Sequence, residues 1–288
     1  MRKKHYTLDN WESKLSSLDA FNVLEEKDLK IITAAKSKIP SWSKILKECF
    51  ESLEAEFTRE SLIQNFSASI IKIEQLAYNT FQKYESIALS FLVVKWMEEH
   101  GREIRDLQKN GIIRSLSEDE PLLPNLKSII GNILEKAFPV ISKFQISTSQ
   151  MRKKRAGETF QEIVASLLRK IDISCERVYS GNGDDFGHSN IVVPSVNVAR
   201  MYPDRAIFID CPHTLAERWW ASTSIPQKGR TAYLVTLDNR ISRKKAIRIN
   251  EQGIVMFVPD HVAELDKLSD LPWVRKLSKL PEELLRRQ

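Results

Sequence analysis

Apolar residues recur at helical spacing through the first half of the chain. The pattern predicts a helix at 8–18 and then four further helices, at 27–38, 42–57, 60–98 and 125–138. Pro40 separates the first two of these four. Pro139 is expected to end the fourth, because proline removes a backbone hydrogen bond from a helix interior. The aromatic residues in these segments fit a helix-packing core.

From about residue 147 the pattern changes to short apolar runs that alternate with amphipathic segments. Strands are predicted at 190–195, 205–210, 231–237 and 254–258, and helices at 158–171, 214–223, 242–251 and 277–285. The run from Ile191 to Val193 is entirely β-branched, as in a strand that is buried on both faces. The expected fold class is therefore α/β, with a central mixed β-sheet flanked by helices and preceded by an α-helical N-terminal region. We expect the helical region to cover 1–146 and the α/β core to cover 147–288.

Composition is that of an ordinary globular protein. Hydrophobic residues make up 42% of the 288 positions and charged residues 28%, so the chain can bury a substantial core. The three cysteines are widely spaced and form no C-x-x-C pair, which favours reduced thiols over a disulfide framework or a zinc site. No apolar run approaches the roughly 18 residues of a membrane span, and no signal-peptide pattern follows Met1. These features predict a cytoplasmic protein with no membrane association.

The net charge of +6 is compatible with a polyanionic partner. One basic stretch is a run of four cations, Arg152, Lys153, Lys154 and Arg155. At a helix start these cations would oppose the macrodipole and would gain from a phosphate partner, although a solvated helix start explains them as well. A second basic stretch follows Ser242, which is expected to cap a helix rich in lysine and arginine. Both stretches are candidates for contact with a nucleic-acid backbone.

Four motifs in a fixed order give the chain a family resemblance. The first is Arg-Ala-Gly-Glu-Thr-Phe-Gln at 155–161. The second joins the strand Asn-Ile-Val-Val-Pro-Ser at 190–195 to Thr-Leu-Ala-Glu-Arg-Trp at 214–219, about twenty residues later. The segments at 233–242 and 253–259 complete the series. In this order the motifs, which cover roughly 145–260, resemble the catalytic and recognition segments of type II restriction endonucleases of the EcoRII/SsoII group.

The resemblance implies a restriction-endonuclease-like core that cleaves DNA at a PD-(D/E)xK metal site. It also implies an aspartate four residues before Pro194, a lysine two residues before Thr214, and two further acids that complete the metal site. All four positions are substituted in this chain, by Asn190, Pro212, Gln161 and Ile225. Every substitution removes charge, and a pocket without carboxylates binds Mg²⁺ poorly. We therefore expect a degenerate cleavage centre that takes no cofactor.

A displaced metal site is the alternative interpretation. Asp210 stands two residues before Pro212 and is the candidate metal ligand, while Asp185 lies a few residues before Asn190. The missing lysine would then be replaced by one of three residues, His213, Lys228 or Arg230. On this interpretation the chain is an active, Mg²⁺-dependent type II restriction endonuclease. Without a metal, Asp210 fits a strand-end acid and Asp185 an ordinary turn of Gly, Asn and Asp.

The recognition half of the family pattern is better preserved. In the family, the helix that corresponds to 214–223 reads sites that begin with CC and end with GG. Glu217 and Arg218 match the charged residues of that family helix, although Ala216 replaces a cation. Arginine bonds a guanine edge and a carboxylate accepts from cytosine N4, but Glu217 also fits a capping box with Thr214. We therefore predict a sequence-specific protein that binds double-stranded DNA, as a homodimer suited to a palindromic site. A helical interaction protein with no nucleic-acid role would explain residues 1–145 but not the motifs that follow.

Overall fold

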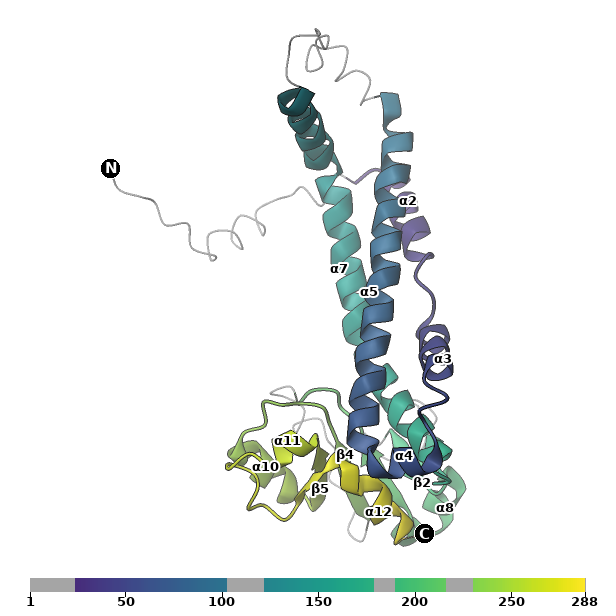
Figure 1. The fold of residues 1–288 in the computed structure, drawn as a ribbon, viewed down its shortest axis with the longest axis vertical. Helices are drawn as coiled ribbons and strands as arrows, with labels where there is room; N and C mark the ends of the chain where they lie inside the picture. The colour runs from purple at the N-terminus through teal and green to yellow at the C-terminus, as the bar shows by residue number, and fades with distance from the viewer. Residues whose placement is uncertain (1–23, 103–121, 179–189, 216–229, 288) are drawn as a thin grey trace, which may run out of the picture. The chain divides into compact units, whose positions relative to one another are not determined.

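The computed structural model describes residues 24–102, 122–178, 190–215 and 230–287 (Figure 1). The chain divides into two compact units. One is formed by Met1–Pro40 with Phe81–Met151, and the other by Ser41–Thr80 with Arg152–Gln288. The units interleave along the sequence because two long helices, α5 (Phe66–Glu99) and α7 (Leu122–Lys170), each contribute to both. A domain boundary at residue 146 stays a prediction.

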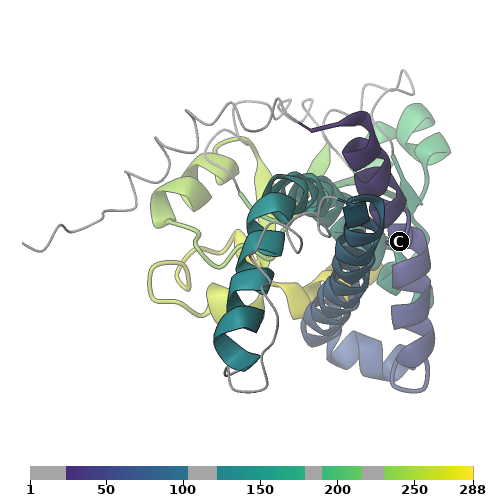
Figure 2. The same cartoon turned by 90° about the horizontal axis from the view of Figure 1, so that it is seen from above.

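The first unit is helical. It contains α2 (Glu26–Lys36), the later part of α5 and the earlier part of α7, and α5 and α7 run side by side there in both views (Figures 1 and 2). A buried polar contact links α2 to the residue that follows α5, since His100 Nε2 lies 3.0 Å from Asp28 Oδ1. The His100 ring also stacks on Trp96, with ring centroids 4.6 Å apart. His100 therefore connects α2 to the end of α5, with a polar contact to Asp28 and ring stacking on Trp96.

Helix α7 corrects the prediction of a helix that ends at Pro139, because the helix continues through that proline to Lys170. Proline removes one hydrogen bond and bends a helix without ending it when packing holds both sides, and Ala137, Val140 and Phe144 are buried around it. In Figure 1 the N-terminal stretch of α7 is inclined to the rest of the helix. The basic run at 152–155 therefore lies within α7, and the macrodipole argument made for a helix start does not apply to it.

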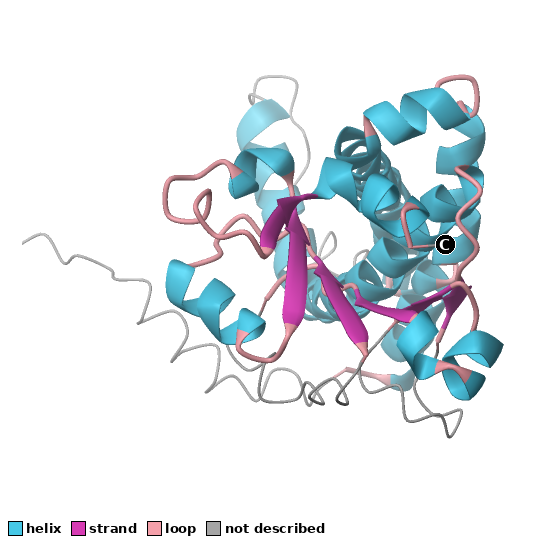
Figure 3. Ribbon diagram, turned by 90° about the horizontal axis from the view of Figure 1, so that it is seen from below, coloured by secondary structure: helices cyan, strands magenta, loops and turns pink. Residues whose placement is uncertain are grey.

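The second unit is built on a six-stranded sheet in the order β1-β2-β3-β4-β5-β6 (Figure 3). The strands are β1 (Glu176–Arg177), β2 (Ile191–Val193), β3 (Ile207–Asp210), β4 (Thr231–Val235), β5 (Ile254–Val258) and β6 (Val274–Lys276). Strand β2 is antiparallel to both β1 and β3, and the strands from β3 to β6 are parallel to one another. This mixed sheet with flanking helices, together with the N-terminal helices, confirms the predicted α/β fold class.

Within the described residues, six shorter helices complete the second unit. They are α3 (Trp42–Ser52), α4 (Arg59–Gln64), α8 (Val196–Met201), α10 (Arg243–Asn250), α11 (Asp260–Ala263) and α12 (Leu280–Leu285), with 3₁₀ turns at Pro203–Arg205 and Leu277–Lys279. The predicted helix at 60–98 is two helices, because α4 ends at Gln64 and α5 begins at Phe66. The predicted helix at 8–18 lies outside the described residues. Helix α8 was not predicted, and Ser195, expected inside a strand, caps it by accepting the Val198 N–H. Ser242 caps α10 as expected.

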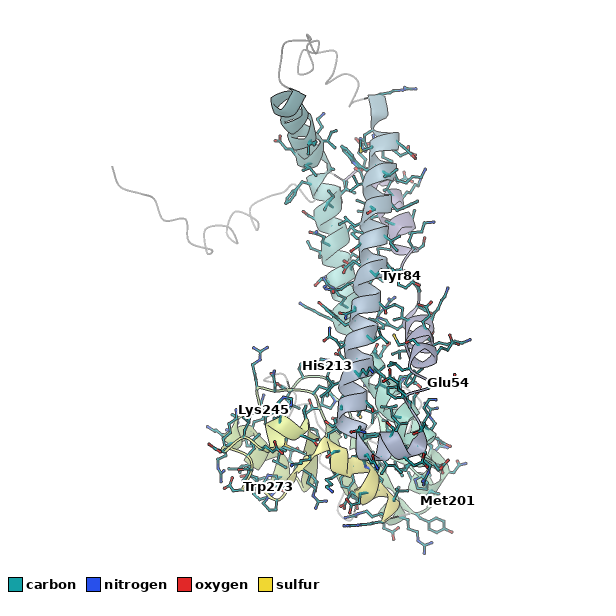
Figure 4. The ribbon with its side chains drawn as sticks, viewed as in Figure 1. Glu54, Tyr84, Met201, His213, Lys245 and Trp273 are labelled. Carbon is teal, nitrogen blue, oxygen red and sulfur yellow. The ribbon has the colours of Figure 1, made fainter. Side chains whose placement is uncertain are left out.

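The core of the second unit lies between the parallel strands and the helices that follow them. Apolar side chains of β4, β5, α10 and α11 form one buried cluster, against which Trp273 packs (Figure 4). The end of α7 supplies a second set of fully buried residues, Phe160, Ile163, Val164, Leu167, Leu168 and Ile171, as its amphipathic pattern predicts. None of the described helices is both long enough and apolar enough to span a membrane.

Candidate functional site

Two described positions of the expected cleavage centre, Asn190 and Pro212, lie where the start of β2 meets the end of β3. The Asn190 N–H donates to the Ile209 carbonyl at 2.9 Å, and Asn190 Oδ1 accepts the Cys211 N–H at 2.8 Å. Because β2 and β3 are antiparallel, Asn190, Asp210 and Cys211 lie at one end of the strand pair. The only side-chain oxygen of Asn190 is therefore already a hydrogen-bond acceptor.

Arg177 of β1 lies at the same end of the sheet, since it pairs with Ile191. Its side chain is only 13% exposed, and its guanidinium bonds two residues of α7. Nη1 donates to Glu162 Oε2 at 2.9 Å, and Nη2 donates to Gln161 Oε1 at 2.8 Å. The guanidinium thus bonds the amide oxygen of Gln161, which replaces an expected acid of the family. Arg177 is absent from the sequence motifs. The only sequence signal for it is a single cation between an apolar stretch that ends at Cys175 and the polar residues from 180 onward.

The carboxylate of Glu162 accepts hydrogen bonds from several side chains. Besides Arg177, it accepts hydrogen bonds from Ser166 Oγ at 3.0 Å and from Arg169 Nη2 at 2.8 Å. Burial raises the pKa of Glu162, but the hydrogen bonds from Arg177 and Ser166 and the charges of Arg177 and Arg169 more than offset it, so that the pKa lies below its ordinary value. Glu162 is therefore ionised at neutral pH, with two arginines as counter-ions.

Cys211, which follows Asp210 at the end of β3, has a fully buried thiol. Burial raises the pKa of its thiol well above the ordinary value, the negative charge of Asp210 acts in the same direction, and the positive charge of Arg177 opposes both. The charges of Asp210, the candidate metal ligand, and of Arg177 are therefore both close enough to influence the Cys211 thiol.

These side chains do not fit a divalent metal ion. Mg²⁺ requires hard oxygen ligands, chiefly carboxylates, but Gln161 and Asn190 present amide oxygens that already accept hydrogen bonds. Pro212 has no side-chain donor, and the guanidinium of Arg177 would repel a second cation. Within the described ranges, no three His, Cys, Asp or Glu side chains are grouped so that they could hold a metal ion. Asp185, the other acid of a displaced site, lies outside the described residues.

The described candidates for the missing lysine contact other groups. His213, labelled in Figure 4, places Nε2 3.0 Å from Glu74 Oε1 on α5. Its ring also lies nearly perpendicular to the Phe160 ring, with centroids 5.8 Å apart. The Arg230 guanidinium lies over the Phe208 ring, 5.0 Å from its centroid. Lys228 lies outside the described residues, as do Glu217, Arg218 and Ile225.

The segment that leads to Glu217 and Arg218 is anchored to the end of β4 and to α10. The Leu215 N–H donates to Asp238 Oδ2 at 2.8 Å, and Thr236 Oγ1 donates to the His213 carbonyl at 3.2 Å. Lys245 Nζ donates to the Leu215 carbonyl at 2.6 Å. The Thr-Leu-Asp motif at 236–238 thus holds the chain that enters the expected recognition helix.

The basic run keeps part of its charge available at the surface. Lys153 is exposed, Arg152 and Arg155 are half-buried, and nothing is described of the Lys154 side chain. Burial lowers the pKa of Arg155, although the charge of Glu158 opposes this effect. An anion beside Arg155 would favour its charged form.

Comparisons with known proteins agree with the motifs. The model of the family described as EcoRII C terminal matches residues 125–270, just over half of the chain. Metal-depleted Ecl18kI in complex with uncleaved, modified DNA has a TM-score of 0.71 and 18% identity, over 91% of this chain and 83% of that chain. The restriction endonuclease PspGI in complex with substrate DNA has a TM-score of 0.59 and 17% identity, over 88% and 95%. No curated protein gives a significant match. The family match, with the structural likenesses supporting the fold, shows that the chain belongs to the EcoRII C-terminal family of type II restriction endonucleases.

Proposed function

We propose that the protein binds double-stranded DNA sequence-specifically, and that its metal-dependent cleavage centre is degenerate. The family and the two structural neighbours, both solved with DNA, support the first part. One observation carries the second part, the bonding of the Arg177 guanidinium to Gln161 and Glu162 where the family places its metal ligands.

The chemistry of the centre explains why a bonded guanidinium opposes cleavage. Hydrolysis of a phosphodiester needs an activated water, and a metal ion bound by carboxylates generates it. Asn190, Gln161 and Pro212 carry no group that can take a proton from water at neutral pH. The charge of Glu162 is already neutralised by Arg177 and Arg169.

Glu217 and Arg218 read the bases, at sites that begin with CC and end with GG. The cations of 152–155 contact the phosphate backbone and fix the position of the protein without reading sequence. A homodimer would place two such surfaces on a palindromic duplex in the cytoplasm.

Binding and cleavage can be tested on the same duplexes. Gel shifts compare a CC…GG duplex with a scrambled duplex, and plasmid cleavage is assayed with Mg²⁺ and with Mn²⁺. We expect preferential binding of the CC…GG duplex and no discrete plasmid fragments. Arg218→Ala should reduce the preference by about 1–3 kcal/mol, roughly 5-fold to 150-fold. Arg286→Ala removes an exposed arginine near the C-terminal end and is the charge-matched control.

Two results would overturn the proposal. Equal binding of both duplexes, or none, would remove the specific DNA-binding role. Discrete fragments that disappear on Asp210→Ala would instead establish an active Mg²⁺-dependent endonuclease that uses a displaced ligand.

A further inference from the structure

His213 is held by three different elements of the second unit, although it lies in the stretch that follows β3 (Figure 4). Its carbonyl accepts a hydrogen bond from Thr236 Oγ1, just after β4, at 3.2 Å. Its Nε2 atom lies 3.0 Å from Glu74 Oε1 on α5. Its ring packs nearly perpendicular to the ring of Phe160 on α7. The main chain, the ring nitrogen and the ring of this one residue are thus each fixed by a separate element.

The contact with Glu74 comes from a distant part of the chain, 139 residues before His213. The two side chains are 29% and 28% exposed, so the pair lies partly in the protein interior. Within the described ranges, the Glu74 carboxylate has no second hydrogen-bond partner. Its neighbour Gln75 instead bonds Asn79 on the same helix, at 3.0 Å. Helix α5 therefore directs one carboxylate at the stretch that follows β3.

This contact acts where the chain leaves β3 for the expected base-reading residues. Two residues after His213, the Leu215 N–H donates to Asp238 and the Leu215 carbonyl accepts from Lys245. Hydrogen bonds to the main chain fix where the backbone lies, and a side-chain contact on the same stretch also fixes its rotation. A hydrogen bond to a base edge is lost when its atoms move apart by less than about 1 Å, so a small rotation at residue 213 matters four residues later.

We infer that Glu74 is a positioning residue for sequence recognition, which acts through His213 to orient the segment that carries Glu217 and Arg218. The inference rests on the proposed reading of bases by these two residues, and it adds α5 to the elements that determine specificity. The role depends on reach, because the side chain at 74 has to place an acceptor 3.0 Å from His213 Nε2. A general electrostatic effect on DNA binding would instead follow the charge at 74.

Two conservative variants of Glu74 separate reach from charge. Glu74→Asp keeps the charge but withdraws the carboxylate by one carbon–carbon bond, about 1.5 Å. Glu74→Gln removes the charge but keeps an oxygen that can accept from His213 at the same reach. The affinities for a CC…GG duplex and for a scrambled duplex are measured for each variant. We expect Glu74→Asp to lower the ratio of the two affinities by about 5-fold or more, the lower end of what one guanine contact contributes, and Glu74→Gln to keep most of the ratio.

His213→Asn breaks the same contact from the other side, because the shorter amide does not reach the position of Nε2. It should lower the ratio by a similar factor, and adding Glu74→Asp should lower it no further, since both changes remove one contact. Gln75→Ala is the matched control on α5, because it removes only a contact within the helix, and it should leave the ratio unchanged. Thermal melting checks that the variants are folded, as expected for a partly exposed pair.

The outcomes separate this inference from the proposed function. A wild-type protein that binds both duplexes equally, or neither of them, would overturn both. If the wild type prefers the CC…GG duplex and both Glu74→Asp and His213→Asn keep that preference, the positioning role is wrong while sequence-specific binding stands. A loss in Glu74→Gln without one in Glu74→Asp would also overturn the role, because specificity would then follow charge. An equal loss in Gln75→Ala would assign the effect to α5 as a whole and not to Glu74.

Discussion

Replacing Arg177 by methionine tests whether the buried guanidinium stabilises the centre. Methionine keeps much of the aliphatic bulk of the side chain but removes all of its hydrogen-bond donors. The substitution therefore breaks the bond to Glu162 Oε2 and the bond to Gln161 Oε1. Glu162 loses one of its two counter-ions.

The structure sets the size of the expected effect. Removing one partner of a fully buried ion pair costs about 3–5 kcal/mol, because the other charge is left uncompensated. Glu162 keeps Arg169 and Ser166 as partners, and its side chain is 33% exposed, so the cost should be lower. We expect a loss of about 2–3 kcal/mol, which lowers the melting temperature of a domain of this size by roughly 4–12 °C.

The loss should depend on pH. The folded pKa of Glu162 lies below its unfolded value, so its contribution to stability is present above the unfolded pKa and disappears as pH falls through the folded pKa. Arg177→Met removes the strongest of the effects that lower this pKa, while burial continues to raise it. The difference in melting temperature between wild type and variant should therefore be largest near neutral pH and should shrink on acidification.

The assay is thermal unfolding followed by circular dichroism, in a double-mutant cycle with Glu162→Gln. A coupling energy of about 1 kcal/mol or more is expected between Arg177 and Glu162. Arg169→Met is the matched control, because it removes an arginine that bonds the same carboxylate but is 50% exposed, and it should cost less than about 1 kcal/mol. A wild-type melting temperature for Arg177→Met, or a coupling energy near zero, would refute the argument.

Two further predictions concern burial. Burial raises the pKa of all three thiols, that of Cys175 to about 11, so Ellman's reagent at pH 8 should modify none of Cys49, Cys175 and Cys211 until the chain is unfolded. A thiol that reacts in the folded protein would contradict the packing described. Phe160→Ala should cost about 3–5 kcal/mol because the ring is fully buried, whereas Phe138→Ala, at a side chain that is 57% exposed, should change the melting temperature little. Similar melting temperatures for the two variants would show that the end of α7 does not form part of the core.

The sheet could be predicted where its strands are buried on both faces. The apolar runs behind β2, β3, β4 and β5 contain no polar interruption, so the sequence alone indicates them. The two edge strands were not predicted, because β1 has two residues and β6 three, and both carry charged side chains. Such short strands form because a neighbouring strand pairs with them, and the local sequence pattern does not indicate this pairing. For the same reason packing carries α7 through Pro139, where the local signal predicted an end.

The candidate centre was predicted only in part. The motifs point to Gln161, Asn190 and Pro212, and the structure places Asn190 beside β1, whose Arg177 bonds Gln161. Sequence motifs show which charges are absent, but they do not show which group replaces them. Arg177 and Glu162 are fifteen residues apart on different elements, so their contact depends on the fold.

The substitutions at this centre are electrostatically consistent with one another. A carboxylate at Gln161 or Asn190 would add a negative charge next to Glu162 and Asp210, and a metal ion would then be needed to balance it. With amides at both positions, Arg177 and Arg169 neutralise Glu162. The amide oxygens accept the hydrogen bonds that hold Arg177 and Cys211 in place. Such a centre keeps the ends of β1, β2 and β3 together without a metal ion. On the proposed function, this internal charge balance preserves the frame that positions the DNA-reading segment after Cys211, whether or not a divalent cation is present.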